Sequence, residues 1–106
     1  MANRWGIPIK VEKYVLERDS TCVYCGIEFS NDTRKTKASW EHIVNDIRIN
    51  GTDNIALCCM ACNASKGAKL LPMWLEGNYC KNKNITSETV AKVVKDAIVN
   101  PPTLIE

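Results

Sequence analysis

The sequence contains two pairs of cysteines with the same internal spacing, Cys22-x-x-Cys25 and Cys59-x-x-Cys62. Four thiolates in two such pairs form a ligand set typical of a tetrahedral structural zinc site, with Zn–S bonds of about 2.3 Å. A closed shell of four sulfurs leaves no position for water or substrate, so we expect this zinc to stabilise the fold without taking part in catalysis. The alternative, that all four are buried thiols without a metal, does not account for the repeated spacing.

Two further cysteines, Cys58 and Cys80, fall outside these pairs. We expect both to be ordinary free thiols, since cysteine packs as a small apolar residue. Cys58 leaves an ambiguity, because zinc also tolerates the spacing from Cys58 to Cys62. We assign Cys59 as the ligand because it repeats the spacing of the first pair.

A second group of residues offers nitrogen and oxygen ligands. His42 is the single histidine of the chain, and it directly follows Glu41. A neutral imidazole can accept a proton near neutral pH. Taken alone, however, a single histidine is more often a hydrogen-bonded structural residue, and a single glutamate is more often a solvated charge. The pair therefore has to be interpreted together with Asn54 and with Asn63, which directly follows Cys62.

The segments Cys-Val-Tyr-Cys-Gly, Glu-His-Ile, Asn-Ile-Ala-Leu and Cys-Met-Ala-Cys-Asn-Ala-Ser-Lys-Gly occur in this order between about residues 22 and 74. This order resembles the zinc-containing branch of the HNH endonuclease family. The resemblance implies an α+β fold, with a small ββα-metal (His-Me finger) core, a structural zinc site of four cysteines and flanking helices. It also implies that His42 is a general base, that Asn54 holds the loop after the first strand, and that Asn63 is a ligand of a catalytic cation. Glu41 would be the second ligand.

The family often has aspartate where this chain has Glu41. The additional methylene group leaves three alternatives, in which the carboxylate binds the cation directly, binds it through water or only lies nearby. Oxygen ligands of this kind suit Mg²⁺ or Mn²⁺ better than zinc. The cofactors implied are thus one structural Zn²⁺ and a catalytic Mg²⁺ or Mn²⁺.

The activity implied by the resemblance is hydrolysis of phosphodiester bonds in DNA. We expect little sequence specificity, because no element for reading bases can be identified in so short a chain. Two alternatives stay open: a ribonuclease that uses the same site, and a zinc-stabilised module that binds nucleic acid without cutting it. The module would have no need for Glu41, His42 and Asn63 together.

Basic side chains are candidates for phosphate contacts. The net charge of +2 is too small to indicate a polyanionic partner by itself. Lys66 lies one helical turn beyond Asn63, where it could face the same phosphate or be a solvated surface residue. The other candidates are Arg48, Lys69, Arg34, Lys35 and Lys37. Trp40 and Trp74 are expected in the core rather than as platforms for stacked bases.

The composition is that of one globular domain, taken as residues 1–106, with 45% hydrophobic and 25% charged residues. No apolar run is long enough to span a bilayer, so we expect no membrane partner. The first residues do not form a secretory signal, and we therefore expect a cytoplasmic protein with reduced thiols. Symmetric cleavage of both strands of a duplex would favour a homodimer.

The elements that must position these residues follow from hydrophobic spacing and from turn residues. We expect helices at 8–19, at 64–71 and at 86–99, the second weakened by Gly67 and the third capped by Thr86 or Ser87. Strands are expected at 38–44 and 54–57, on either side of a polar loop. The polar stretch 77–84 is interpreted as a linker.

Overall fold

The computed structural model describes residues 6–104, so the outermost residues of the expected domain, 1–5 and 105–106, lie outside the description. Its elements in chain order are α1 (Ile9–Arg18), the 3₁₀ turn η1 (Arg34–Thr36), β1 (Ala38–His42), β2 (Ile55–Cys59), α2 (Met60–Lys66), α3 (Leu71–Leu75), α4 (Asn78–Lys83) and α5 (Lys92–Val99). The chain is a small mixed helix-and-strand domain around a two-stranded sheet. No helix within the described residues is long and apolar enough to cross a membrane.

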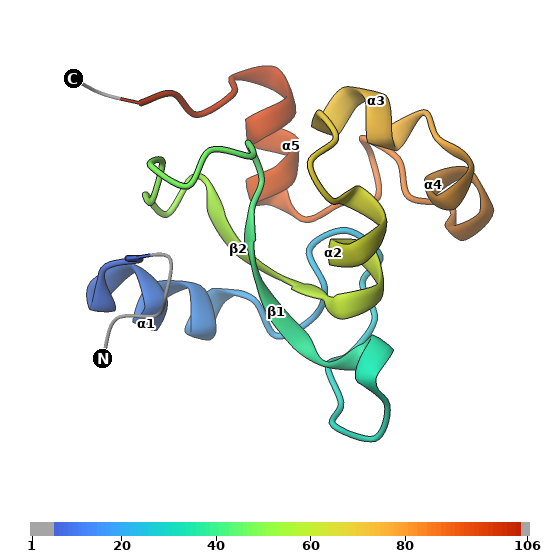
Figure 1. The fold of residues 1–106 in the computed structure, drawn as a ribbon, viewed down its shortest axis with the longest axis horizontal. Coiled ribbons are helices and arrows are strands. Elements are labelled where there is room, and N and C mark those ends of the chain that lie inside the picture. The colour runs from blue at the N-terminus through green and yellow to red at the C-terminus, as the bar shows by residue number, and fades with distance from the viewer. Residues whose placement is uncertain (1–5, 105–106) are drawn as a thin grey trace.

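The two strands form an antiparallel hairpin at the centre of the molecule (Figure 1). Its register pairs Ala38 with Cys59 at one end and His42 with Ile55 at the other. At about 3.4 Å per residue, the two ends of the ladder are roughly 14 Å apart. The hairpin therefore separates a cysteine-bearing end from a histidine-bearing end.

Helices cover the hairpin on different sides. In Figure 1, α1 lies on one side of the hairpin, while α2, α3 and α4 lie on the other. The side chains between α1 and the sheet form a small apolar cluster that includes Val15, Ile55 and Leu57. A larger cluster contains the cysteine pairs, Tyr24 and Trp74, whose rings meet edge to face at 4.9 Å. The larger cluster forms the main core, and Trp74 lies in it as expected.

The expected helix at 64–71 differs from the observed one. Helix α2 already begins at Met60 and ends at Lys66, and Gly67 follows with a φ of +49°. A positive φ is readily adopted by glycine but costs other residues free energy, which makes glycine a common residue just after a helix. Gly67 is thus the C-cap of α2 rather than a weak point inside it.

Two other expectations need correction. The stretch 77–84 is not a linker, because it contains helix α4, whose Cys80 is fully buried and whose C-cap Asn84 has a left-handed φ of +58°. The last helix begins at Lys92, not at residue 86. Before it, the Thr86 hydroxyl accepts hydrogen bonds from the backbone N–H groups of Glu88 and Thr89, which forms a separate turn. Polar side chains therefore form hydrogen bonds within local turns at places where the hydrophobic pattern does not decide the element.

Candidate functional site

The sulfur atoms of Cys22, Cys25, Cys59 and Cys62 all lie within 4.8 Å of one another. The distance between the Cys25 and Cys59 sulfurs is 3.8 Å. Four ligands at the corners of a tetrahedron, each about 2.3 Å from zinc, are about 3.8 Å apart. The cluster is therefore positioned to hold a metal ion in the way that a structural zinc site requires, as the cysteine spacing predicts.

Local backbone geometry produces both halves of this cluster. In the first pair, the Cys25 N–H donates to the Cys22 sulfur at 3.4 Å, and Gly26 closes the turn with a φ of +77°. In the second, Cys59 is both the last residue of β2 and the N-cap of α2, where its sulfur accepts from the Cys62 N–H at 3.5 Å. Amide donors that point at sulfur favour the thiolate form that binds zinc.

The thiols of the cluster share protons unequally. A hydrogen bond with Cys62 lowers the pKa of Cys22 to about 5 and raises that of Cys62. Burial raises the pKa of Cys25 to about 11. The cluster therefore favours one thiolate while other members keep their protons, and binding of a metal to all four sulfurs would release those protons.

Cys58 and Cys80 lie outside the cluster. Cys58 is on the neighbouring position of β2, so its side chain leaves the opposite face of the strand from that of Cys59. It lies 3.8 Å from the Ser39 hydroxyl, and burial raises its pKa. Burial also raises the pKa of Cys80, to about 11. The assignment of Cys59 to the cluster, rather than Cys58, is confirmed.

Glu41 lies on β1 within a buried group of charges. Its Oε2 accepts a hydrogen bond from the Tyr24 hydroxyl at 2.5 Å and lies 3.0 Å from the Lys66 ammonium. Glu41 is 7% exposed and Lys66 only 1%. Burial, together with the adjacent Glu41 carboxylate, raises the pKa of Tyr24 well above its usual value. Burying a carboxylate is tolerable here because an ammonium and a hydroxyl both face it.

Lys66 therefore differs from both alternatives that the sequence offered. It neither extends into solvent nor projects towards a ligand outside the protein, because its stem is buried and its ammonium pairs with Glu41 and lies 3.5 Å from the His42 carbonyl oxygen. The cause is the geometry of two elements, since α2 packs against the face of β1 that carries Glu41. Only this packing shows that the lysine has an internal partner.

Asn63 is held over the same strand. Its amide nitrogen donates to the Ser39 hydroxyl at 2.8 Å and to the Trp40 carbonyl at 3.2 Å. Asn63 and Lys66 are three residues apart on α2, so they share one face of that helix. Ser39 and Glu41 share one face of β1 for the analogous reason. Helix α2 thus places Asn63 over Ser39 and Trp40 and, one helical turn further on, Lys66 against Glu41.

His42 ends β1 and faces the following loop. Its Nε2 is 2.8 Å from Oδ1 of Asn50, and the residue is 7% exposed. Successive strand residues point to opposite faces, so Glu41 and His42 leave β1 in different directions.

Asn54 organises the loop between the strands. It is completely buried, and its side chain accepts from the Val44 N–H at 2.7 Å while donating to the carbonyl oxygens of Val44 and Ile49. These bonds join the start of the loop to its end. Asn54 therefore fixes the backbone directly after His42, which is the place in the chain where the resemblance puts a loop-holding asparagine.

The remaining basic candidates are divided between the two ends of the hairpin. Arg34, Lys35 and Lys37 precede β1, at the end far from His42. Arg48 is in the loop near His42, where it is exposed and pairs with Asp46 at 2.8 Å. Lys69 follows α2 and is exposed, with its ammonium 3.0 Å from the Ser65 carbonyl. These residues do not form one basic surface around His42.

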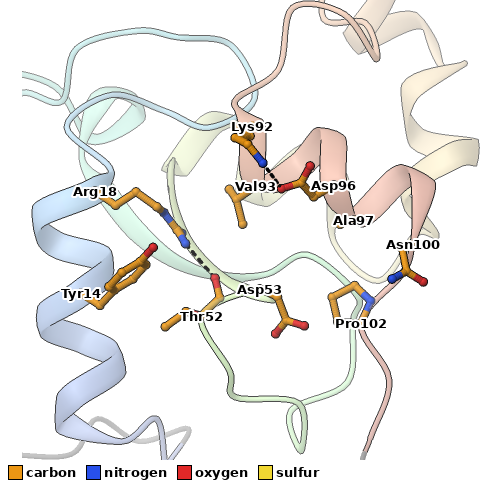
Figure 2. Close-up of a pocket in the computed structure, with 10 residues that line it drawn as sticks. All are labelled: Tyr14, Arg18, Thr52, Asp53, Lys92, Val93, Asp96, Ala97, Asn100 and Pro102. Carbon is orange, nitrogen blue, oxygen red and sulfur yellow. Dashed lines mark hydrogen bonds and ion pairs between the residues drawn. The ribbon is translucent and has the colours of Figure 1, made fainter.

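A groove of about 590 Å³ lies between α1, the loop residues Thr52 and Asp53, and α5 (Figure 2). Inside it, Arg18 donates to the Thr52 carbonyl, and Lys92 pairs with Asp96. Arg18 also donates to the Ile55 carbonyl, so that helix α1 holds the backbone on both sides of Asn54. The groove contains none of the candidate site residues. Its Arg18 side chain holds the end of the loop between the strands through the Thr52 and Ile55 carbonyls.

Two residues of this polar site were missed by the sequence analysis. Tyr24 is a partner of Glu41 within the first cysteine pair, and Asn50 is the partner of His42. The sequence contains no signal for Tyr24 beyond its place between two ligands. Asn50 lies in a polar loop whose composition predicts only a turn, so the sequence gives no sign that it contacts His42.

No family model, no curated protein and no solved structure matches this chain.

Proposed function

We propose that this protein is a metal-dependent endonuclease of the HNH type, which hydrolyses phosphodiester bonds of DNA in a ββα-metal core. Residues His42, Glu41 and Asn63 carry the chemistry, and Asn54 holds the loop that presents His42. The four cysteines hold a structural zinc. The resemblance described above suggests this function, and the hydrogen bonding of the three polar side chains supports it.

The observation that carries the proposal is that each of the three polar side chains has one nitrogen or oxygen atom without a hydrogen bond to the protein. Every buried side-chain nitrogen and oxygen of the described residues has a hydrogen-bond partner. Yet Glu41 uses only Oε2, Asn63 uses only its nitrogen, and His42 uses only Nε2. No hydrogen bond to Oε1 of Glu41, Oδ1 of Asn63 or Nδ1 of His42 is found among the described residues, and none of these atoms is a fully buried atom without a partner. These are two hard oxygen ligands and one base, which is the set that metal-assisted hydrolysis requires.

Each residue has a separate task in the proposed reaction. Glu41 and Asn63 would hold Mg²⁺ or Mn²⁺, which supplies positive charge to stabilise the phosphate as it gains negative charge. His42 takes a proton from the water whose oxygen attacks phosphorus. A phosphorus–oxygen bond to one sugar breaks, and the departing oxygen receives a proton from solvent. Lys66 pairs with the Glu41 carboxylate within the protein.

Contacts to the polymer are few in this proposal. Arg48 and Lys69 are exposed, Arg48 in the loop after His42 and Lys69 just after α2, whereas Arg34, Lys35 and Lys37 would contact a more distant part of the strand. Such side chains bind phosphates rather than base edges, so they confer little sequence specificity. Affinity should accordingly fall with rising salt concentration.

The test is cleavage of supercoiled plasmid and of labelled RNA, each with Mg²⁺, Mn²⁺ or a weak chelator that leaves the zinc bound. We expect the wild type to nick the plasmid with either cation, and His42→Ala to lose at least about 100-fold in rate, since a general base contributes about 10²–10⁴-fold. Lys95→Ala, which removes an exposed lysine from α5, is the control and should cut as the wild type does.

The same experiment distinguishes the other assignments. Cleavage of RNA alone would identify a ribonuclease with the same site. Binding of DNA without cleavage would identify a non-catalytic zinc-stabilised module. Equal cutting by the wild type and His42→Ala would exclude His42 as the base.

A further inference from the structure

The loop between the strands contains a second asparagine that acts on the His42 ring itself. Asn50 bridges two groups: its Oδ1 is 2.8 Å from His42 Nε2, and its Nδ2 is 2.9 Å from the Ile47 carbonyl oxygen. Asn54, by contrast, bonds only to backbone groups. The loop thus uses one asparagine for its backbone and another for the imidazole.

The bond to Ile47 determines which way the Asn50 amide faces. A carbonyl oxygen can only accept a hydrogen bond, so the group that meets Ile47 must be the NH₂ of Asn50. Its oxygen then faces His42, and an amide oxygen also can only accept. The neutral imidazole must therefore carry its proton on Nε2 and leave the lone pair on Nδ1.

We propose that Asn50 is a positioning residue that holds the neutral His42 ring in its Nε2–H tautomer and directs Nδ1 to solvent. Nδ1 has no hydrogen-bond partner among the described residues and reaches solvent, because no buried side-chain nitrogen there lacks a partner. The tautomer is a property of the folded chain. Its catalytic value, a base already in the correct form, rests on the proposed function.

The loop is built to keep this arrangement. Ile49, directly before Asn50, is buried, and its carbonyl accepts from the Asn54 side chain at 3.0 Å. The Ile49 N–H donates to the Asp46 carbonyl at 3.0 Å, which closes a turn around Ile47. The backbone on the N-terminal side of Asn50 is therefore anchored before the side chain is placed. Holding a base in one orientation and one tautomer removes entropy from the reacting state in advance.

The test is direct because His42 is the only histidine. Long-range ¹H–¹⁵N spectra of ¹⁵N-labelled zinc-loaded protein at about pH 8.5, where imidazole is ordinarily neutral, report the tautomer of this single ring. We expect the Nε2–H form with a visible, exchange-protected Nε2 proton. Asn50→Ala should lose that protected proton, while Asn50→Asp, which keeps an acceptor, should retain it.

Asn45→Ala is the matched control, because Asn45 is an exposed asparagine of the same loop. It should leave the spectrum unchanged. An Nδ1–H tautomer in the wild type, or the same protected proton in Asn50→Ala, would overturn the proposal, whether or not the protein cuts DNA.

If the wild type cuts DNA, Asn50→Ala should also lower kcat about tenfold while KM for DNA changes little, with Asn50→Asp less affected than Asn50→Ala at the same pH. Equal kcat for Asn50→Ala and wild type would remove the catalytic role of Asn50 but leave the proposed nuclease function intact. Failure of the wild type to cut would remove the nuclease proposal, while the spectra would still decide the tautomer.

Discussion

The two ends of the β1–β2 hairpin carry clusters of opposite chemical character. At the Cys59 end, four sulfurs lie within 4.8 Å of one another, and a hydrogen bond with Cys62 lowers the pKa of Cys22 to about 5. Towards the His42 end, Glu41 and His42 each have a protein partner, and Asn63 has its partners further back along β1, at Ser39 and Trp40. The first cluster is positioned to hold a metal ion. The second is stable without one, so any cation that it binds can come and go without loss of the fold.

The largest expected effect tests the dependence of the cysteine cluster on metal. Cys59→Ser should lose zinc and unfold, because zinc contributes about 10–16 kcal/mol in isolated zinc-finger peptides and a whole domain is stable by only about 5–15 kcal/mol. Far-ultraviolet circular dichroism and metal content by mass spectrometry measure the two losses. The control is Cys80→Ala, a buried thiol outside the cluster, which should stay folded with zinc bound. A folded, zinc-free Cys59→Ser protein would contradict the comparison.

A smaller effect tests the internal pairing of the polar site. Lys66→Met should lower the free energy of unfolding by about 3–5 kcal/mol in the absence of divalent cations, because it leaves the buried Glu41 carboxylate without its counter-charge. Urea unfolding of zinc-loaded protein measures this value. Lys69→Met, at an exposed lysine just after α2, should cost little.

Two further measurements sharpen this prediction. The double variant Glu41→Gln/Lys66→Met should recover much of the lost stability, since no unpaired charge then remains. Under the proposed function, Mg²⁺ should also stabilise Lys66→Met more than it stabilises the wild type, because a cation would replace the missing ammonium. Wild-type stability in Lys66→Met without cations would show that the ion pair does not hold the site.

The smallest effect concerns the exposed pair in the loop after His42. The Arg48 guanidinium lowers the pKa of Asp46 to about 2. A carboxyl group with a lowered pKa in the folded state stabilises that state above its ordinary pKa, and this contribution is lost as the pH falls through about 2. Arg48→Ala should return the Asp46 pKa towards 3.8 without a measurable change in stability at neutral pH.

Nuclear magnetic resonance titration of the Asp46 carboxyl carbon measures this shift. An Asp46 pKa that stays near 2 in Arg48→Ala would mean that the loop backbone, rather than the guanidinium, stabilises the carboxylate.

The cysteine cluster could be predicted almost completely from the sequence, and the polar site only in part. Each half of the cluster is a local turn of four residues, so spacing alone carries the information, including the choice of Cys59 over Cys58. Asn54, which the sequence places before the second strand, bonds to Val44 and Ile49 within the same loop, so its partners are also close in the sequence. The strands were located to within a few residues, since the turn residues between them are distinctive.

The contacts that could not be predicted depend on which faces of the helices and strands pack against each other. Lys66 has a buried partner only because α2 packs on the Glu41 face of β1, and spacing along α2 cannot show what lies opposite. Tyr24 reaches Glu41 across 17 positions of sequence. The sequence does not predict helix α4, because most of its residues are polar. Its two core contacts are the buried Cys80 and Tyr79, whose ring stacks on that of Trp74 at a centroid distance of 5.9 Å. Such contacts arise from tertiary packing, which overrides local patterns.

The contact between Cys25 and Cys59 also has a consequence for the order in which the protein assembles. These ligands are 34 positions apart, and the chain between them contains β1, the loop and β2. A metal ion that binds both cysteine pairs would close that segment into a ring. The ring reduces the number of conformations available to the unfolded chain. His42, Asn50 and Asn54 all lie on this ring, and Asn63 and Lys66 follow its closure within seven positions. With a structural zinc as proposed, binding of the metal would therefore shorten the remaining conformational search for the polar site.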